Sequence, residues 1–235
     1  MRRDWGITIE LLGHIPEDAV PILDILALPG DLLVIVGVLG MLSLLDIGRN
    51  VRESSAPLWS ANLAFVVATV LGGLALVVAL ESLFGLPRPP AHWHRADASP
   101  YAFPSGHTMA ATVCWGALAM WYIRPLRVSA IFSGILVISV GFARLALGLH
   151  YVPDILAGVG FGLGYLALAG YLADGSPRRA FAIALTIAVV ALFSTGFGDR
   201  ALLAFGGVLG ATAAWAVLST GFAEVRLAGR SSDRQ

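Results

Sequence analysis

Long apolar runs with few charges repeat along the whole chain. The cleanest run covers about residues 58–83 and carries no charge between Leu58 and Leu80. A helix that crosses the hydrocarbon core of a bilayer needs roughly 20 mostly apolar residues, and this run is long enough. Charged residues make up 13% of the chain and hydrophobic residues 57%, whereas a soluble domain carries about 25% charged residues. We therefore predict an integral membrane protein.

The runs predict an all-α, polytopic transmembrane helical bundle of six to seven spans. Because the connections are short, we expect one domain over 31–223, with the motif-bearing core at 58–173 in the second to fifth spans. Residues 1–30 hold two short amphipathic pieces broken by prolines and are expected to be interfacial or re-entrant, and 224–235 form a polar tail. The expected spans are about 31–47, 58–83, 105–123, 128–147, 153–173, 180–197 and a last one ending near 222.

All fifteen basic residues are arginine, and the net charge is zero, which gives no case for a nucleic-acid partner. Cytoplasmic loops carry an excess of basic residues. The face that holds the C-terminus is therefore expected to be cytoplasmic, because it collects most arginines: Arg49, Arg52, Arg124, Arg127, Arg178, Arg179, Arg226, Arg230 and Arg234. The opposite, extracytoplasmic face collects Arg88, the loop 85–104, the start of the third span and the break from Arg144 to Asp154.

The break between the fourth and fifth spans places Arg144, His150 and Asp154 between two apolar runs. Ionisable groups are costly near hydrocarbon, so such a cluster is a functional-site hypothesis. Pro153 is a good first helical residue, which puts Asp154 in the first turn. We expect its carboxylate to accept a hydrogen bond from one ring nitrogen of His150, leaving the other facing the site. Taken alone, the pair would favour a structural role at a helix end.

Two further motifs fall on the same face. In Pro104-Ser105-Gly106-His107, Ser105 is expected to cap a helix, and free N–H groups at a helix start favour an anion. Arg88 stands between prolines that hold it rigidly, and a fixed guanidinium suits phosphate oxygens. Taken singly, an ordinary capped helix and an arginine that reaches lipid headgroups remain alternatives.

Together these groups match the needs of phosphoryl transfer. Positive groups would hold the phosphate oxygens, His150 would attack phosphorus, and His107 would protonate the leaving alcohol and then activate water. No carboxylate cluster suggests a divalent metal, and the single Cys114 excludes a cysteine cluster. We therefore expect a metal-independent reaction without a cofactor.

The three motifs resemble the type 2 phosphatidic acid phosphatase superfamily, which shares its site with vanadium haloperoxidases. Its pattern is Lys-x6-Arg-Pro, then Pro-Ser-Gly-His, then Ser-Arg-x5-His-x3-Asp, and here Arg88-Pro89, 104–107 and 144–154 match it. The resemblance implies that His150 is the nucleophile, His107 the acid and Asp154 the partner that orients His150. It also implies phosphate binding by Arg88, Ser105, Gly106 and Arg144.

The chain departs from that pattern at two positions. Ala143 replaces a serine, and Glu81 takes the place of the lysine. Because a carboxylate repels phosphate, we expect Glu81 to pair with Arg88 or Arg144, or to face out of the site, and phosphate binding to be weaker than in relatives with lysine. His92 and His94 lie in the loop above the site, where an interfacial position is favoured over contact with a substrate head group.

The sequence thus predicts a membrane phosphatase that hydrolyses a lipid phosphate or diphosphate of the phosphatidic acid, phosphatidylglycerol phosphate or polyprenyl diphosphate type. Its partners would be that substrate and the bilayer, and the oligomeric state stays open. One alternative is a phosphatase of a soluble phosphate ester. Another is a lipid-phosphate binding or transport protein with a degraded site, which Glu81 alone supports.

Overall fold

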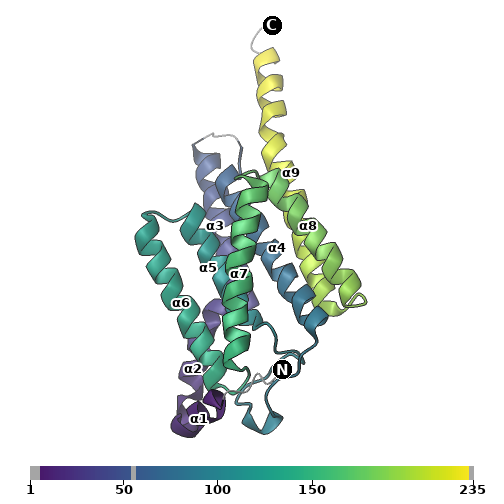
Figure 1. Ribbon diagram of the computed structural model, residues 1–235. Helices are drawn as coiled ribbons and strands as arrows, with labels where there is room; N and C mark the ends of the chain where they lie inside the picture. The colour runs from purple at the N-terminus through teal and green to yellow at the C-terminus, as the bar shows by residue number, and fades with distance from the viewer. Residues whose placement is uncertain (1–5, 54–56, 233–235) are drawn as a thin grey trace.

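The computed structural model describes residues 6–53 and 57–232, with side chains as far as residue 219. Its regular elements are helices, apart from one isolated bridge between Pro87 and Tyr101, and they form an elongated bundle (Figure 1). The helices are α1 Ile7–His14, α2 Val20–Ala27, α3 Leu32–Arg52, α4 Ala61–Phe84, α5 Gly106–Trp121, α6 Leu126–Ala146, α7 Val152–Ala173, α8 Pro177–Ser194 and α9 Asp199–Ser232.

Six of the described helices are long and apolar enough to cross a membrane, namely α3, α4, α6, α7, α8 and the first 21 residues of α9. This confirms the predicted all-α polytopic bundle. The predicted third span, 105–123, is shorter than expected, because α5 has 16 residues and ends at Trp121. The chain turns there ahead of Pro125, and a residue before proline is disfavoured in the helical conformation.

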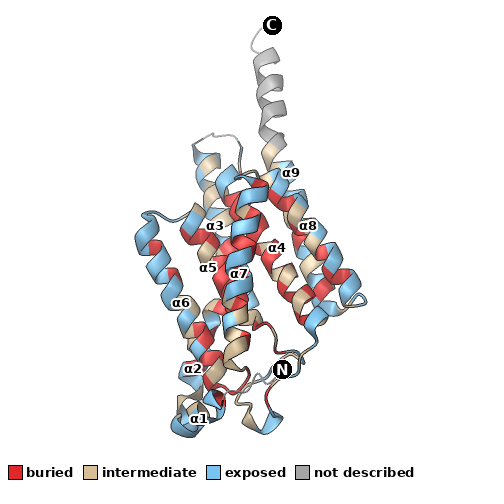
Figure 2. Cartoon of the chain, viewed as in Figure 1, coloured by how far each residue is buried: buried red, intermediate tan, exposed pale blue. Residues whose placement is uncertain are grey.

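Helix α4 is the centre of the bundle. In the most apolar stretch of 18 residues of α4, 72% is buried, compared with 11% in the corresponding stretches of α3 and α9 (Figure 2). The surface of α4 is therefore mostly covered by other helices. A helix that is apolar on all sides is expected to be buried, and α4 packs against α3, α5, α7, α8 and α9. Gly72 and Gly73 allow the close approach of Tyr165 from α7.

The two short pieces predicted before residue 30 are the helices α1 and α2, which pack against α6. The indole Nε1 of Trp115 on α5 donates to the carbonyl of Pro29 at 2.9 Å, which ties the end of this segment to the bundle. Its interfacial or re-entrant position stays a prediction. At the other end, α9 continues to Ser232, past the expected end near residue 222, so the backbone of 224–232 is helical.

Three connections lie at one end of the bundle, opposite the C-terminus (Figure 1). They are the long loop between α4 and α5, the short loop between α6 and α7, and the turn between α8 and α9. The first two carry the motifs that the sequence predicts on one face. The third brings the start of α9 to the same end.

The contact of α5 with α7 depends on small residues and offers a matched test. A Cβ added at Gly158 would lie 2.9 Å from the carbonyl oxygen of Ser105, whereas one at Gly160 would meet nothing within 4 Å. We expect Gly158→Ala to lower the free energy of unfolding by about 1–3 kcal/mol through overpacking. Gly160→Ala should leave it unchanged or raise it slightly.

The measurement is the thermal unfolding temperature of each purified variant in the same detergent. A clear drop for Gly158→Ala with no drop for Gly160→Ala is the expected result. Equal effects of the two changes would mean that α5 and α7 do not meet at Gly158.

Candidate active site

The candidate site lies where the start of α5, the start of α7 and the loop between α4 and α5 meet. The backbone N–H of Ser105 donates to the carbonyl of Asp154 at 2.9 Å and so joins the first turns of the two helices. The site therefore rests on helix ends fixed to each other. The structure brings together the two sequence stretches predicted to share one face.

The ring of His150 is fully buried and held by both nitrogens. Its Nδ1 lies 2.9 Å from the carbonyl oxygen of Ala102 and 3.7 Å from Oδ2 of Asp154. Its Nε2 lies 2.9 Å from Nη1 of Arg88. A guanidinium can only donate, so Nε2 is the acceptor and Nδ1 carries the proton. The predicted tautomer therefore fits, but the nearest acceptor of the Nδ1 proton is a backbone carbonyl rather than the expected carboxylate.

Asp154 is fully buried beside His150 in the first turn of α7. Its Oδ2 accepts a hydrogen bond of 2.9 Å from the backbone N–H of Tyr151. This contact fixes the turn that carries His150. Asp154 thus shapes the loop as well as facing the ring.

His150 lies in the loop outside the apolar helices, and burial lowers its pKa to about 4. The carboxylate of Asp154 opposes this shift, while the positive charges of Arg88 and Arg144 favour it. A depressed pKa keeps the imidazole neutral at pH 7. The neutral ring keeps a lone pair on Nε2, which accepts from Arg88 in this structure.

Arg88 is held by several acceptors from two loops. Its Nε donates to the carbonyl of Ser99, its Nη2 to the Ser99 hydroxyl at 2.9 Å, and its Nη1 to the carbonyl of Leu149 at 2.9 Å as well as to His150. The rigidity expected from the flanking prolines is therefore reinforced by the loop. The guanidinium covers Nε2 of His150.

Arg144 is the second guanidinium of the site. It is buried at the end of α6, and its Nε has no hydrogen-bond partner among the described residues. An unpaired buried donor costs about 1–3 kcal/mol, so an anion that accepts from it would be stabilised. Arg144 is therefore prepared for a ligand that carries negative oxygens.

The start of α5 differs in part from the prediction. Ser105 occupies the N-cap position, but its hydroxyl makes no capping bond and lies 2.9 Å from the hydroxyl of Thr108 instead. The predicted N-cap position of Ser105 is therefore confirmed, but its hydroxyl contacts Thr108, one turn on, and caps no backbone N–H. Gly106 and His107 line a cavity, as an anion site at the helix start requires.

Glu81 is nearly fully buried on α4, and its Oε2 lies 2.5 Å from Nη1 of Arg200. The prediction that it pairs with Arg88 or Arg144, or faces out of the site, is wrong. Glu81 lines the same cavity as His107, and its Oε1 would be 2.6 Å from a Cβ at Gly106. The turn between α8 and α9 places Arg200 next to the last turn of α4, and this explains the pairing.

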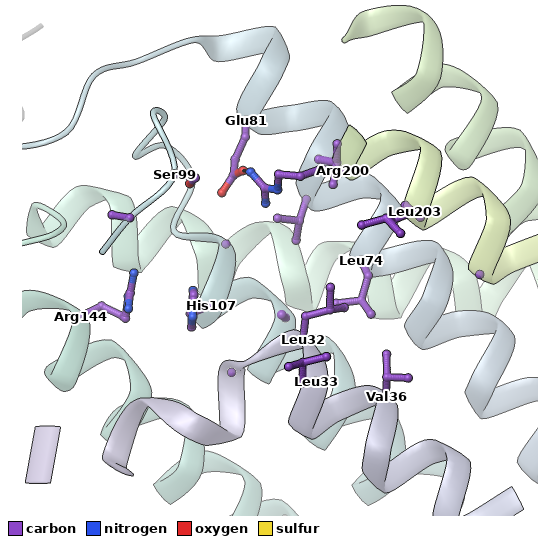
Figure 3. A pocket seen from close by; sticks show the side chains of 18 of the residues that line it. Leu32, Leu33, Val36, Leu74, Glu81, Ser99, His107, Arg144, Arg200 and Leu203 are labelled. Carbon is purple, nitrogen blue, oxygen red and sulfur yellow. Dashed lines mark hydrogen bonds and ion pairs between the residues drawn. The ribbon is translucent and has the colours of Figure 1, made fainter. Parts of the chain in front are cut away.

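A cavity of about 570 Å³ joins these groups to an apolar groove (Figure 3). One end is polar and is lined by Glu81, Arg88, Asp97, Ser99, Gly106, His107, Arg144 and Arg200. The other end runs between α3, α4 and α9 and is lined by Leu32, Leu33, Val36, Leu71, Leu74, Val77, Val78, Leu203 and Ala204. His150 is not on the cavity wall, because Arg88 covers it.

The remaining predicted residues lie away from the cavity wall. Pro104 is buried just before α5. The ring Nε2 of His94 lies 2.9 Å from the carbonyl of Pro89 and steadies the loop, and His92 is exposed beside Trp93. No group of three or more His, Cys, Asp or Glu side chains is arranged to hold a metal in the described ranges. The absence of a metal requirement stays a prediction.

Three residues that contribute to the site were not predicted from the sequence. Ala102 and Ser99 act through a carbonyl or a loop contact, which no side-chain motif reveals. Arg200 carried a usable signal, because it shares with Leu203, Ala204 and Gly207 the spacing of one helix face, and this face of α9 lines the cavity.

Comparison with known proteins agrees with this geometry. The family model of the PAP2 superfamily matches residues 61–175, which contain the three motifs. Residues 61–175 of the chain therefore belong to this superfamily. Its apolar helices and its relatives make it a membrane protein. No solved structure gives a significant match.

Two curated relatives bear the same printed name, phosphatidylglycerophosphatase B. The protein from Bacillus subtilis (strain 168) is 33% identical over 72 residues, which are 28% of this chain and 36% of the relative. The one from Escherichia coli (strain K12) is 34% identical over 86 residues, which are 36% of this chain and 33% of the relative. The matches thus span about a third of the length of these relatives.

Proposed function

We propose that this chain is an integral membrane phosphatase that hydrolyses a phosphate monoester or diphosphate of a lipid. The observation that carries the proposal is the cavity, whose polar end holds three arginines, a histidine and a helix start, and whose other end is apolar. A phosphate group fits the first end and a hydrocarbon tail the second. The names of the two relatives support the same substrate class.

The first step is attack by Nε2 of His150 on phosphorus. In the structure the lone pair of this nitrogen accepts a hydrogen bond from Nη1 of Arg88, 2.9 Å away. It becomes free when Nη1 donates to a phosphate oxygen of the substrate instead. The bond from phosphorus to the leaving oxygen breaks, and protonated His107 gives its proton to that oxygen. The Nδ1–H bond to the carbonyl of Ala102 keeps the ring in place as it becomes positively charged.

The second step regenerates His150. Water attacks the phosphohistidine, neutral His107 takes a proton from that water, and the bond between Nε2 and phosphorus breaks to release inorganic phosphate. Arg88 and Arg144 hold the oxygens in both steps, where charge on them must be stabilised. The buried carboxylate of Asp154 stabilises the positive ring.

A lipid substrate is favoured over a soluble ester by the walls of the groove. Leu32, Leu33 and Val36 of α3 face Leu74 of α4 and Leu203 of α9 across it (Figure 3). An apolar groove accepts a lipid tail without exposing it to water. A small soluble ester would leave this groove empty.

His150→Ala should abolish phosphate release, because it removes the attacking nitrogen. The matched control is His14→Ala, an exposed histidine on α1 whose ring Nδ1 contacts the carbonyl of Glu10. We would measure inorganic phosphate released in detergent micelles from phosphatidic acid, phosphatidylglycerol phosphate and a polyprenyl diphosphate, with a soluble sugar phosphate beside them. Each assay is repeated with EDTA and with vanadate.

The proposal expects activity on lipid phosphates that survives EDTA, falls with vanadate, is lost in His150→Ala by at least about 1000-fold and is kept in His14→Ala. Activity that survives His150→Ala would overturn the mechanism. Activity on the soluble ester alone would overturn the substrate class. No activity on any substrate would favour a binding or transport protein.

We also propose that the protein lies in the cell membrane with the site on the extracytoplasmic face. The loop with Arg88 and the α6–α7 loop lie opposite the end that carries Arg49, Arg124 and Arg178. An excess of arginine marks the cytoplasmic side. The C-terminus would then be cytoplasmic.

Cysteine labelling tests this orientation, because the single native cysteine, Cys114, is buried. Ala91→Cys lies in the exposed part of the α4–α5 loop, and Arg178→Cys lies at the exposed start of α8. A membrane-impermeant maleimide added to intact cells, or to spheroplasts where an outer membrane blocks access, should label the first and not the second. Permeabilised cells should show both. The reverse pattern would place the site on the cytoplasmic side.

A further inference from the structure

The pair of Glu81 and Arg200 is a charged cluster that the mechanism does not use. It joins α4 to α9 across 119 positions of sequence at a distance of 2.5 Å. The side chain of Glu81 is 3% exposed, whereas that of Arg200 is 51% exposed. The carboxylate is thus a buried anchor, and the guanidinium it holds remains accessible.

Arg200 stands at the junction of the two ends of the cavity. On its own helix it shares a face with Leu203, Ala204 and Gly207, all of which line the apolar groove. Through Glu81 it is tied to the polar end, where His107 and Arg144 lie (Figure 3). A lipid that entered with its terminal phosphate at Arg144 would pass Arg200 before its tail reached Leu203.

The guanidinium of Arg200 has donors to spare. It carries five N–H groups. Among the described residues, its Nη1 donates to Oε2 of Glu81. The rest of the head group faces the cavity or its mouth, since Arg200 is half exposed and lines the wall. Guanidinium donors of this kind match the oxygens of a phosphate group.

We infer that Arg200, positioned by Glu81, binds a second phosphate that lies between the phosphate being cleaved and the apolar tail. This inference rests on the proposed phosphatase function and names its substrate class, lipids that carry two phosphate groups. Two kinds of lipid would fit this site. One is a lipid diphosphate, and the other is a lipid whose terminal phosphate ester is joined to the tail through a phosphodiester. In both, the reacting phosphate is terminal and the second one is nearer the tail.

The pair also accounts for the acidic residue in a phosphate site. A lone carboxylate at position 81 would repel the substrate, but Arg200 offsets its charge and adds donors next to the apolar groove. Glu81 is therefore a positioning residue that acts through Arg200. A lipid with a single phosphate gains little from Arg200, because Arg88, Arg144 and the start of α5 take up that phosphate.

The main test compares the wild type with the double variant Glu81→Gln/Arg200→Ala. Removing both charges together leaves no unpaired carboxylate in the site. We would measure kcat and KM in one detergent for phosphatidic acid, farnesyl diphosphate and phosphatidylglycerol phosphate. Arg178→Ala, at the far end of the bundle, is the control for loss of an exposed arginine.

We expect the double variant to lose about tenfold in kcat/KM for the two-phosphate lipids, mainly through a higher KM, and to lose less for phosphatidic acid. Loss on farnesyl diphosphate alone, or on phosphatidylglycerol phosphate alone, would assign the site to that one lipid type. An equal loss on all three lipids, or no loss on any, would overturn the inference while leaving the phosphatase function intact. A wild type inactive on every lipid would overturn both.

The single variants separate the roles of the two residues. Arg200→Ala should be less active than the double variant on every lipid, because it exposes the substrate to the unpaired carboxylate of Glu81. Glu81→Gln should raise the KM for two-phosphate lipids with little change in kcat. If Glu81→Gln leaves the KM for two-phosphate lipids unchanged, Glu81 does not act through Arg200.

Discussion

The imidazole of His150 is fixed through both of its nitrogens, and much of this end of the bundle is organised around it. The carbonyl of Ala102 is 2.9 Å from Nδ1, and the guanidinium of Arg88 is 2.9 Å from Nε2. Arg88 is held in turn by Ser99, and the hydroxyl of Thr8 donates to the carbonyl of His150. The α4–α5 loop and the N-terminal helix α1 therefore both support the position of one ring. The ring is thus already oriented for attack, but Arg88 must first give up its hydrogen bond to Nε2.

The polar end of the cavity is a set of charges kept at the edge of an apolar bundle. Removing a charge from water costs several kcal/mol unless a partner compensates it. Glu81 and Arg200 form an ion pair and compensate each other. Nε of Arg144 has no hydrogen-bond partner among the described residues, and Arg88 donates a hydrogen bond to His150. An incoming phosphate would accept hydrogen bonds from both Arg144 and Arg88. The proposed substrate would thus gain binding energy from one donor without a hydrogen-bond partner among the described residues, Nε of Arg144, and from one that now donates to His150, Nη1 of Arg88.

Much of this arrangement follows from the sequence. Apolar runs predicted the helices, and the second to fifth runs alone placed Arg88, His107 and His150 at one end, because helix direction alternates. The helix face that carries Arg200 can be read from the sequence, but its pairing with Glu81 could not be predicted. The two residues lie 119 positions apart, and their contact depends on how α9 packs against α4. The carbonyl of Ala102 was missed because every residue carries one, so no residue type marks it. The N-cap position of Ser105 was predicted, but the contact of its hydroxyl with Thr108 was not.

The account depends most on the claim that Nε2 of His150 carries the phosphoryl group during turnover. Rapid mixing with a radiolabelled lipid phosphate, quenching in base to preserve phosphohistidine, and peptide mapping would locate the label. The account predicts label on His150 that is labile in acid, lies on Nε2 because Nδ1 faces the carbonyl of Ala102, and is absent from His150→Ala. An active enzyme with label on His107, or with label on Nδ1 of His150, would contradict it.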